Sequence, residues 1–295
     1  MANALYKDRL TMNKNPEQRP VEEINSEQDE SFDDSVNGKG ENTSYDSYDD
    51  NSIDTETGKK ADARISEERS KTIFSRLSQR YNIYNTVTSF GIDRLWRKSL
   101  VEASGMKKNS YVLDLAAGTG DVSFQACKQI RPAHIEITDF TAEMLDVAKN
   151  RAANGANNHV PVSFNIVDAQ NIPYSENQFD VVTMAFGIRN VPNREQALRE
   201  IYRVLKPGGC FACLEFSTPQ AKILGTLYNL YLKIAIPFWG WVFTRKKEDF
   251  EYLAHSIKAF PNQEDFSAML REAGFRRVLY RNKTGGIAAI HTGKK

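Results

Sequence analysis

The sequence predicts an α/β fold in which helices cover a doubly wound, mostly parallel sheet of seven strands. Three observations lead to this class. From about residue 64 onward, short apolar runs alternate with segments of helical periodicity. The first apolar run, residues 111–115, leads through a glycine-rich turn into a helix. Acidic residues stand at the ends of consecutive predicted strands, where sheets of this kind bind their ligands.

The predicted strands are apolar runs bounded by turn residues, and they cover residues 111–115, 134–138, 162–167, 179–186, 210–216, 275–280 and 287–291. A Thr-Gly-Gly turn separates the last two strands and predicts a closing antiparallel pair. The predicted helices carry apolar residues on one face, and they cover residues 66–81, 92–103, 120–130, 141–154 and 194–205. The last of these helices stops at the helix-breaking run 206–209.

The turn after the first strand suits the close approach of a nucleotide-like ligand. Gly118 and Gly120 supply the tight backbone turn, and the helix that follows offers its free N–H groups to an acceptor. The spacing is close to the G-x-G-x-x-G pattern of dinucleotide enzymes, with Ser123 at the third glycine position. The turn alone leaves the identity of the ligand open.

Three aspartates narrow the choice of ligand. Asp139, after the second strand, can accept hydrogen bonds from both ribose hydroxyls, which suits NAD and S-adenosylmethionine alike. Asp168, after the third strand, can accept a hydrogen bond from an adenine amino group. Asp114 lies toward the other end of such a ligand, where its charge suits an ammonium and a sulfonium rather than a pyrophosphate. Each aspartate alone is common in turns and caps, but together they favour S-adenosylmethionine.

The charges are distributed unevenly over the 295 residues of the chain. Residues 1–62 contain 7 Lys and Arg but 16 Asp and Glu, a net charge of −9, whereas the remainder carries +10. The first segment has few large apolar side chains and cannot bury enough surface to offset the entropy of ordering. We therefore expect a disordered acidic tail over residues 1–62 and one folded domain over residues 63–295.

Composition also indicates the compartment. The start of the chain lacks the apolar region of a secretory signal and is too acidic for a mitochondrial transit peptide, so we expect a cytoplasmic protein. The three cysteines give no disulfide framework. Cys210 and Cys213 match C-x-x-C, but within a strand they would face opposite sides, which favours a structural role over a redox role. The four histidines have no ligand spacing, so no metal site is predicted.

Residues 223–243 are rich in large apolar and aromatic side chains, but a lysine, a proline and a glycine interrupt them too often for a membrane span. One interpretation is a core helix with its loop. The other is a lid over an apolar substrate, or a surface that enters the membrane interface with Trp239 and Trp241 as anchors. The basic domain lacks the basic-aromatic clusters of nucleic-acid-binding motifs, so we expect no nucleic acid and a transient contact with an anionic membrane surface.

Several motifs are specific enough to indicate a family, and they lie at residues 81–85, 89–97, 112–121, 186–190, 202–209, 214–217, 252–257 and 284–291. The most discriminating are Phe-Gly-Ile-Arg-Asn at 186–190 and the C-terminal run. Over about residues 70–295 the chain resembles the quinone-biosynthesis C-methyltransferases, which act on demethylmenaquinone and on a ubiquinone precursor. The resemblance implies a Rossmann-like class I methyltransferase domain with S-adenosylmethionine as its cofactor.

The resemblance also assigns cofactor contacts by position. They fall on Thr119, Asp139, Asp168 and Ala169, and a contact that is often a serine in the family falls on Ala185. Loss of that one hydroxyl costs about 0.5–1.5 kcal/mol if it leaves no hydrogen-bond partner unsatisfied. The intact domain and the missing transit peptide look like a bacterial enzyme at the inner face of the cell membrane, which favours demethylmenaquinol as the lipid substrate. The alternatives are a ubiquinone precursor, 2-polyprenyl-6-methoxy-1,4-benzoquinol; a non-catalytic interaction protein; and a nicotinamide oxidoreductase.

Methylation of a ring carbon requires alignment of the reactants and an electron-rich ring. Loss of a proton from a hydroquinone pushes charge onto the adjacent carbon, so a base or charge stabiliser is expected near that hydroxyl. Arg189, just after the fourth strand, is the first candidate, with a structural ion pair as its alternative role. Tyr81 could relay the proton or pack a helix. His255 is the third candidate, because an imidazole exchanges protons near neutral pH.

Overall fold

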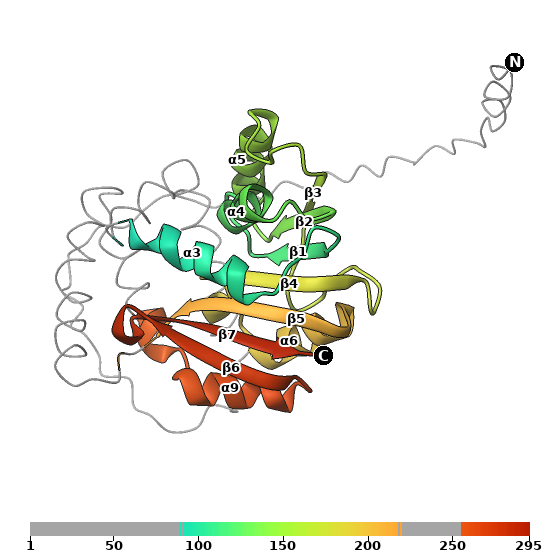
Figure 1. Cartoon of the computed structure of the whole chain (residues 1–295). Helices are drawn as coiled ribbons and strands as arrows, with labels where there is room; N and C mark the ends of the chain where they lie inside the picture. The colour runs from blue at the N-terminus through green and yellow to red at the C-terminus, as the bar shows by residue number, and fades with distance from the viewer. Residues whose placement is uncertain (1–88, 90, 218, 220–254) are drawn as a thin grey trace, which may run out of the picture. The chain divides into compact units, whose positions relative to one another are not determined.

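The computed structural model describes residue 89, residues 91–217, residue 219 and residues 255–295. Within this part of the chain, seven strands form one sheet in the order β3-β2-β1-β4-β5-β7-β6 (Figure 1). The strands are β1 (Tyr111–Leu115), β2 (His134–Asp139), β3 (Val162–Ile166), β4 (Phe179–Ala185), β5 (Leu205–Phe216), β6 (Arg276–Lys283) and β7 (Ala288–Lys294). Strands β1 to β5 are parallel, and β7 runs antiparallel between β5 and β6. The predicted sheet is confirmed.

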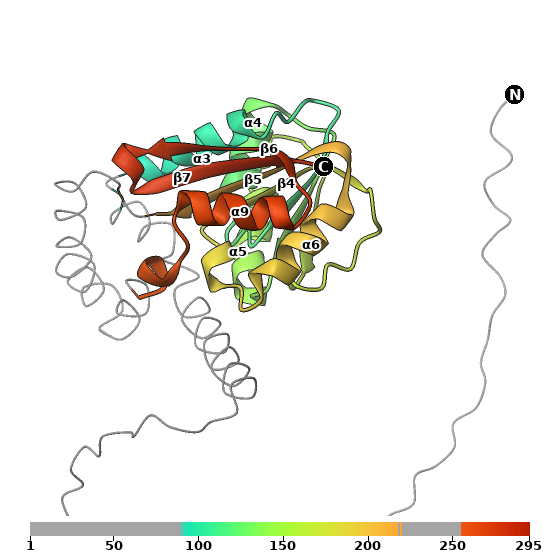
Figure 2. The ribbon, with the colours of Figure 1, turned by 90° about the horizontal axis from the view of Figure 1, so that it is seen from below.

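Helices cover both faces of this sheet (Figures 1 and 2). One face is buried under α3 (Ile92–Ala103), α4 (Asp121–Gln129) and α5 (Ala142–Ala153), which contribute Trp96, Phe124 and Leu145 among others to one hydrophobic cluster. The other face is buried under α6 (Arg194–Val204) and α9 (Gln263–Glu272), which contribute Ile201 and Phe266 to a second cluster. The result is the three-layer arrangement of an α/β domain.

Strand β5 is longer than predicted, because it begins at Leu205, the last residue of the predicted helix, and includes the whole helix-breaking run 206–209. Leu205 pairs with Phe179, and the register then shifts before Val181 pairs with Cys210. Gly209 lies in this irregular start, where an added Cβ would meet the carbonyl oxygen of Lys206 at 2.8 Å. The run therefore ends the helix as predicted but also belongs to the strand.

Helix α9 was missed by the sequence analysis. Its N-cap is Asn262, whose side-chain oxygen accepts hydrogen bonds from the N–H groups of Glu264 and Asp265 at 2.9 and 3.0 Å. Phe266 and Leu270 then place its apolar face on the second hydrophobic cluster. An asparagine followed by two acids is a helix-start signal that was present in the sequence.

Some expectations lie outside the described residues: the acidic tail over residues 1–62, the helix over 66–81 and the apolar stretch over 223–243. In the ranges that are described, no helix combines the length and the apolar character needed to cross a bilayer. Cys210 and Cys213 are both buried in β5. Because three positions separate them in a strand, they face opposite sides of the sheet, as the sequence predicts.

Candidate cofactor and active site

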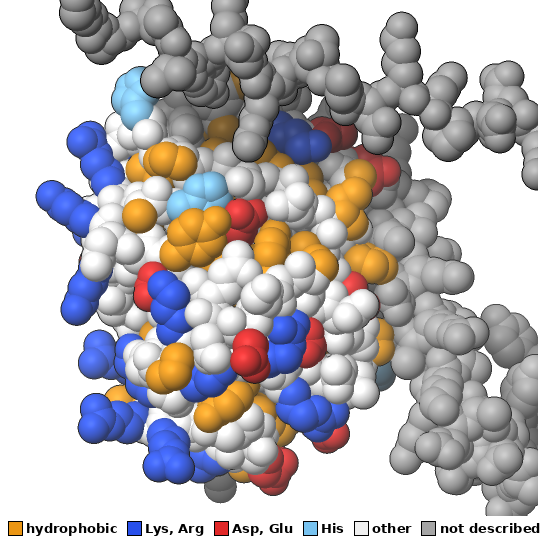
Figure 3. Space-filling model, turned by 90° about the vertical axis from the view of Figure 1, so that its right-hand side faces the viewer, with side chains coloured by type: hydrophobic (Ala, Val, Ile, Leu, Met, Phe, Trp, Pro, Cys, Tyr) orange, Lys and Arg blue, Asp and Glu red, His pale blue; other side chains and the backbone are white. Residues whose placement is uncertain are grey.

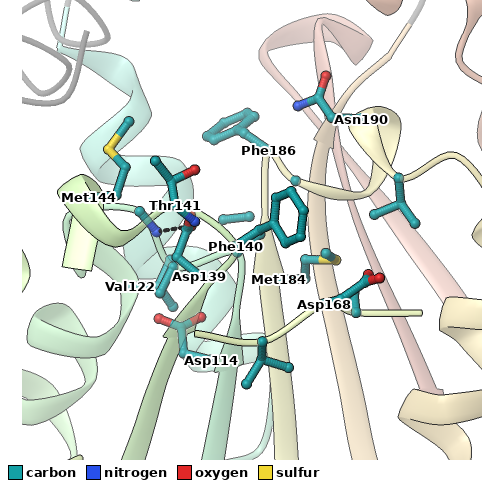
Figure 4. A pocket seen from close by; sticks show the side chains of 18 of the residues that line it. Asp114, Val122, Asp139, Phe140, Thr141, Met144, Asp168, Met184, Phe186 and Asn190 are labelled. Atoms are coloured by element: carbon teal, nitrogen blue, oxygen red, sulfur yellow. Dashed lines mark hydrogen bonds between the residues drawn. The ribbon is translucent and has the colours of Figure 1, made fainter. Parts of the chain in front are cut away.

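A pocket opens at the carboxyl ends of β1, β2 and β4 (Figure 4). It contains about 1050 Å³ of space, counting the solvent in its mouth. Its walls come mainly from the segments that follow the strands, at residues 114–122, 139–144, 167–170 and 184–192. The strand order reverses between β1 and β4, and this switch point is where open α/β sheets bind ligands.

Seven of the eight predicted cofactor residues line this pocket, namely Asp114, Gly118, Thr119, Asp139, Asp168, Ala169 and Ala185. The exception is Gly120, which caps α4 with a φ of 84°. A Cβ at this position would lie 2.6 Å from Cε2 of Phe124. Gly120 therefore permits the turn and its packing without belonging to the pocket wall.

The Asp139 carboxylate ties the glycine turn to the end of β2. Its Oδ2 accepts a hydrogen bond from the Gly118 N–H at 2.8 Å, and its Oδ1 accepts one from the Thr141 N–H at 2.9 Å. Burial raises the pKa of Asp139, and these two N–H donors act in the opposite direction. Each oxygen keeps a further lone pair, so the carboxylate can also accept hydrogen bonds from ligand hydroxyls.

Asp114 is buried deeper in the same wall. Its carboxylate accepts hydrogen bonds from the Ser123 N–H at 3.1 Å, the Ser123 hydroxyl at 2.5 Å and the Thr183 hydroxyl at 2.7 Å. Burial raises the pKa of Asp114 to about 6, although these donors lower it. Figure 4 shows Asp114 and Asp139 close together, with Asp168 across the pocket. The carboxylate thus has structural partners in addition to any ligand.

Asp168 both lines the pocket and stabilises a local turn, which are the two roles that the sequence left open. Its side chain lines the pocket and also accepts a hydrogen bond from the Gln170 N–H at 2.9 Å. The Gln170 side-chain amide donates to both Asp168 oxygens at 3.2 and 3.3 Å. The local turn therefore fixes the carboxylate in the orientation in which it lines the pocket.

Arg151 of α5 fixes the glycine turn from outside the pocket. One guanidinium nitrogen, Nη1, donates to the Thr119 carbonyl oxygen at 2.6 Å and lies 3.2 Å from the Thr119 hydroxyl oxygen. The same nitrogen binds the Asp121 carboxylate at 2.7 Å. The guanidinium also lies 4.9 Å from the centre of the Phe124 ring. The charged Arg151 side chain thus holds the turn in place, and the glycines of the turn allow its backbone conformation.

Much of the remaining wall consists of residues to which no sequence motif assigned a role. The additional lining residues include the cationic Arg97 and the apolar Val122, Phe140, Met144, Met184 and Phe186. Phe140 directly follows Asp139 in sequence, and this proximity to a predicted cofactor contact could have indicated that Phe140 lines the pocket. Arg97 belongs to a family motif but was given no role. In the described residues no group of three or more His, Cys, Asp or Glu could hold a metal ion.

Arg189 forms the ion pair that was its alternative role. It lies in η1 (Ile188–Asn190), and its Nη1 is 2.7 Å from the Glu215 Oε1 and 2.7 Å from the Phe186 carbonyl oxygen. Both charged side chains are buried. Phe186 has a φ of 58°, an unfavourable conformation for a bulky residue, and lines the pocket. The ion pair therefore supports a strained part of the pocket wall, while Arg189 itself is not among the described lining residues.

The other two catalytic candidates stay predictions. Tyr81 lies outside the described residues. His255 is exposed in a short helical stretch and does not belong to the described pocket wall.

The fold and the pocket define a nucleotide-binding α/β domain with the arrangement of class I methyltransferases. The chain belongs to the ubiE/COQ5 methyltransferase family, which it matches over residues 62–295. S-adenosylmethionine is the cofactor of this family, and the glycine turn and acidic wall fit it.

Curated relatives agree with this membership. The chain is 45% identical over 226 residues to the ubiquinone/menaquinone biosynthesis C-methyltransferase UbiE of Agrobacterium fabrum, a match that covers 76% of this chain and 87% of the relative. It is 41% identical over 225 residues to the UbiE of Pseudomonas aeruginosa, with the same coverage of 76% and 87%.

Solved structures support the fold. A SAM-dependent methyltransferase of Thermotoga maritima matches with a TM-score of 0.53 and 20% identity, over 76% of this chain and 99% of that one. A Haemonchus contortus phosphoethanolamine N-methyltransferase in complex with S-adenosylhomocysteine matches with a TM-score of 0.51 and 16% identity, over 68% of this chain and 52% of that one. At these identities the likeness establishes the fold alone.

The first prediction concerns Asp139. Asp139→Ala should weaken S-adenosylmethionine binding by about 1.5–3 kcal/mol, because a charged acceptor for the ribose hydroxyls is lost. Calorimetric titration measures the dissociation constant. Asp146→Ala is the matched control, since Asp146 is an exposed α5 residue whose ion pair among the described residues is with Lys149. Unchanged affinity in a folded Asp139→Ala protein would remove Asp139 from the cofactor site.

The second prediction concerns the buried ion pair. Arg189→Met and Glu215→Gln should each lower the free energy of unfolding by about 3–5 kcal/mol, because each leaves a buried partner unmatched. The double variant should lose less than the sum of the two, as expected for groups in contact. Chemical denaturation gives the three values. Arg189→Lys with an unchanged melting temperature but roughly 100- to 1,000-fold slower turnover would instead assign Arg189 to catalysis.

Proposed function

We propose that this protein transfers the methyl group of S-adenosylmethionine to a ring carbon of demethylmenaquinol, which yields menaquinol. The family membership, together with a pocket that combines an acidic nucleotide-binding wall with an apolar wall, carries this proposal. Its coarser form is the S-adenosylmethionine-dependent C-methylation of a quinol; the names of the relatives describe those proteins as C-methyltransferases of ubiquinone and menaquinone biosynthesis.

The pocket residues suit the task of methyl transfer. When bound, the cofactor supplies an electrophilic methyl group on a positively charged sulfur. Asp139 and Asp168 would bind the nucleoside, and the close backbone approach at Gly118 would position it. Met184 and Phe186 line the neighbouring wall, where apolar side chains would exclude water from the reacting carbon. A ring hydroxyl that loses its proton would provide the nucleophilic carbon, with Tyr81 and His255 as candidate bases.

The substrate assignment has a direct test. Purified protein should methylate a short-chain demethylnaphthoquinol with a kcat/KM about tenfold higher than that for a 6-methoxybenzoquinol, because a second ring adds apolar surface for the wall to bury. Transfer of a radiolabelled methyl group from S-adenosylmethionine measures both rates. The oxidised naphthoquinone is the control, and it should remain unmethylated because it has no hydroxyl to ionise. A preference for the benzoquinol would reassign the enzyme to the ubiquinone branch.

We further propose that the protein works at the inner face of the cell membrane, where its lipid substrate resides. The supporting feature is a surface, here called the α3–β6 surface, formed by Arg94, Leu95 and Lys98 of α3 with Leu279 and Arg281 of β6. Leu95 and Leu279 are each 64% exposed, unusual for leucine. Exposed leucines flanked by basic residues suit the interface of an anionic bilayer.

The register of the strands indicates that these groups share one side of the sheet. Leu279 and Arg281 pair with Thr292 and Ile290, and Ile290 belongs to the hydrophobic cluster beneath α3. A hydrogen bond of 3.0 Å from the Trp96 indole to the Thr284 hydroxyl joins α3 to the turn after β6. Figure 3 shows Lys and Arg side chains along its left border, which is the side facing the viewer in Figure 1.

The membrane proposal predicts charge-dependent vesicle binding. Arg94→Gln with Arg281→Gln should lower the partition coefficient on vesicles of phosphatidylglycerol and phosphatidylcholine by about 30-fold, at about 1 kcal/mol for each lost charge. Co-sedimentation measures the bound fraction at low salt. Arg199→Gln with Arg271→Gln removes the same charge from exposed positions of α6 and α9 on the other face and should change binding little. Equal losses in both double variants would show that only net charge matters and would refute this surface.

A further inference from the structure

We propose that Arg97 binds the carboxylate of the methionine part of S-adenosylmethionine. The inference rests on the proposed function and adds a residue that neither the motifs nor the positional resemblance assigned. It begins from the charges of the pocket wall. Four aspartates, Asp114, Asp121, Asp139 and Asp168, line the pocket, and Arg97 is the one cationic side chain among the described lining residues.

This charge distribution poses an electrostatic problem for the cofactor. S-adenosylmethionine carries two positive groups, the sulfonium and the ammonium, and one negative group, the carboxylate. The aspartates attract the positive groups but repel the carboxylate, and these forces are strong in a partly buried pocket where the effective dielectric constant is low. A cationic partner for the carboxylate is therefore needed close to the acids, and Arg97 is the lining residue that meets this requirement.

The side chain of Arg97 is held ready for such a contact. Arg97 is buried on the inner face of α3, where its guanidinium binds the buried Asp93 carboxylate and lies 5.3 Å from the centre of the Phe186 ring. Asp93 is in turn bound by the Ser89 hydroxyl at 2.7 Å. A guanidinium with a fixed orientation loses little freedom when it binds a ligand, and its planar set of donors matches a carboxylate.

Among the described residues, the contacts of the Arg97 guanidinium leave donors for a ligand. A guanidinium has five N–H groups. One nitrogen, Nη1, binds Asp93, and the other, Nη2, lies 3.7 Å from an Asp121 oxygen, which is beyond hydrogen-bond length. Asp121 has a closer partner in Arg151 at 2.7 Å. Arg97 can therefore engage a ligand carboxylate while it keeps its bond to Asp93.

Arg151 provides the comparison that separates a ligand contact from a structural one. Both arginines lie near the Asp121 carboxylate, Arg97 at 3.7 Å and Arg151 at 2.7 Å, but Arg151 holds the Thr119 backbone and does not belong to the described pocket wall. If Arg97 only links α3 to α4, its loss should resemble the loss of Arg151. If it binds the carboxylate, its loss should affect only those ligands that have one.

The experiment is a calorimetric titration with two ligands that differ by one group. S-adenosylhomocysteine carries the carboxylate, and its decarboxylated analogue lacks it. In the wild-type protein the first should bind roughly 10- to 100-fold more tightly, as expected for charge-assisted hydrogen bonds. In Arg97→Met this ratio should fall to near one, because S-adenosylhomocysteine loses affinity and the analogue does not. In Arg151→Met the wild-type ratio of the two affinities should remain, even if both ligands bind more weakly.

Each result has a defined meaning. An undiminished ratio in Arg97→Met, or an equal loss for both ligands, would overturn the assignment and leave Arg97 a structural link. Arg97→Lys covers the case in which the methionine variant fails to fold, since it keeps the charge and should retain an intermediate affinity ratio. A full wild-type ratio in Arg97→Lys would count against the proposal. So would loss of the ratio in both Arg97→Lys and Arg151→Met. A wild-type protein that binds neither ligand would overturn the cofactor assignment itself, whereas a wild type that binds both equally would overturn only the role of Arg97.

Discussion

The buried side chain and backbone of Asp114 join four elements at the point where the sheet reverses its strand order. The carboxylate accepts hydrogen bonds from Ser123 at the start of α4 and from Thr183 in β4, and the Asp114 carbonyl oxygen accepts one from the Thr138 hydroxyl in β2. Such a buried carboxylate is costly to desolvate and persists because several donors surround it. The donors come from separate parts of the chain, so the network requires that β1, β2, β4 and α4 all reach their final places.

The glycine turn depends on this network. Gly118 and Thr119 lie in the turn after β1, and their positions are fixed on one side by Asp139 and on the other by Arg151. The turn thus receives its shape from charged partners on β2 and α5, and its glycines make that shape sterically possible. A ligand approaching this turn meets a backbone that is already held in place, which lowers the entropy lost on binding.

The sequence predicted the parts of the molecule that repeat a local pattern. The alternation of apolar runs and amphipathic segments was sufficient for the sheet and for α3 to α6, and the ends of β1 to β3 located the acids of the pocket. Features that depend on tertiary contacts were harder to predict. The choice between two roles for Arg189 required Glu215, which is 26 residues away in sequence. The irregular start of β5 required its pairing with Phe179 in β4.

Position in the pocket was another property that motifs alone could not give. Gly120 belongs to the same turn as Gly118, yet it faces Phe124 rather than the pocket. Arg97 lies in a recognisable motif, but its importance comes from the four aspartates that other segments bring around it. The role of charged residues from distant segments can be inferred only when the fold places these residues together.

The hydrogen bond between Trp96 and Thr284 spans 188 positions of the chain and connects the first described helix to the turn before the final strand. Strand β7 lies between β5 and β6, so the edge strand β6 joins the sheet only through the strand that follows it in sequence. Contacts of such long range are slow to form during folding. The inner face of α3, which carries Arg97 to the pocket, is held both by this hydrogen bond and by its packing on α4 and β5. The turn at Thr284 is thus linked through α3 to the wall of the methyl-donor pocket, although it lies outside that wall.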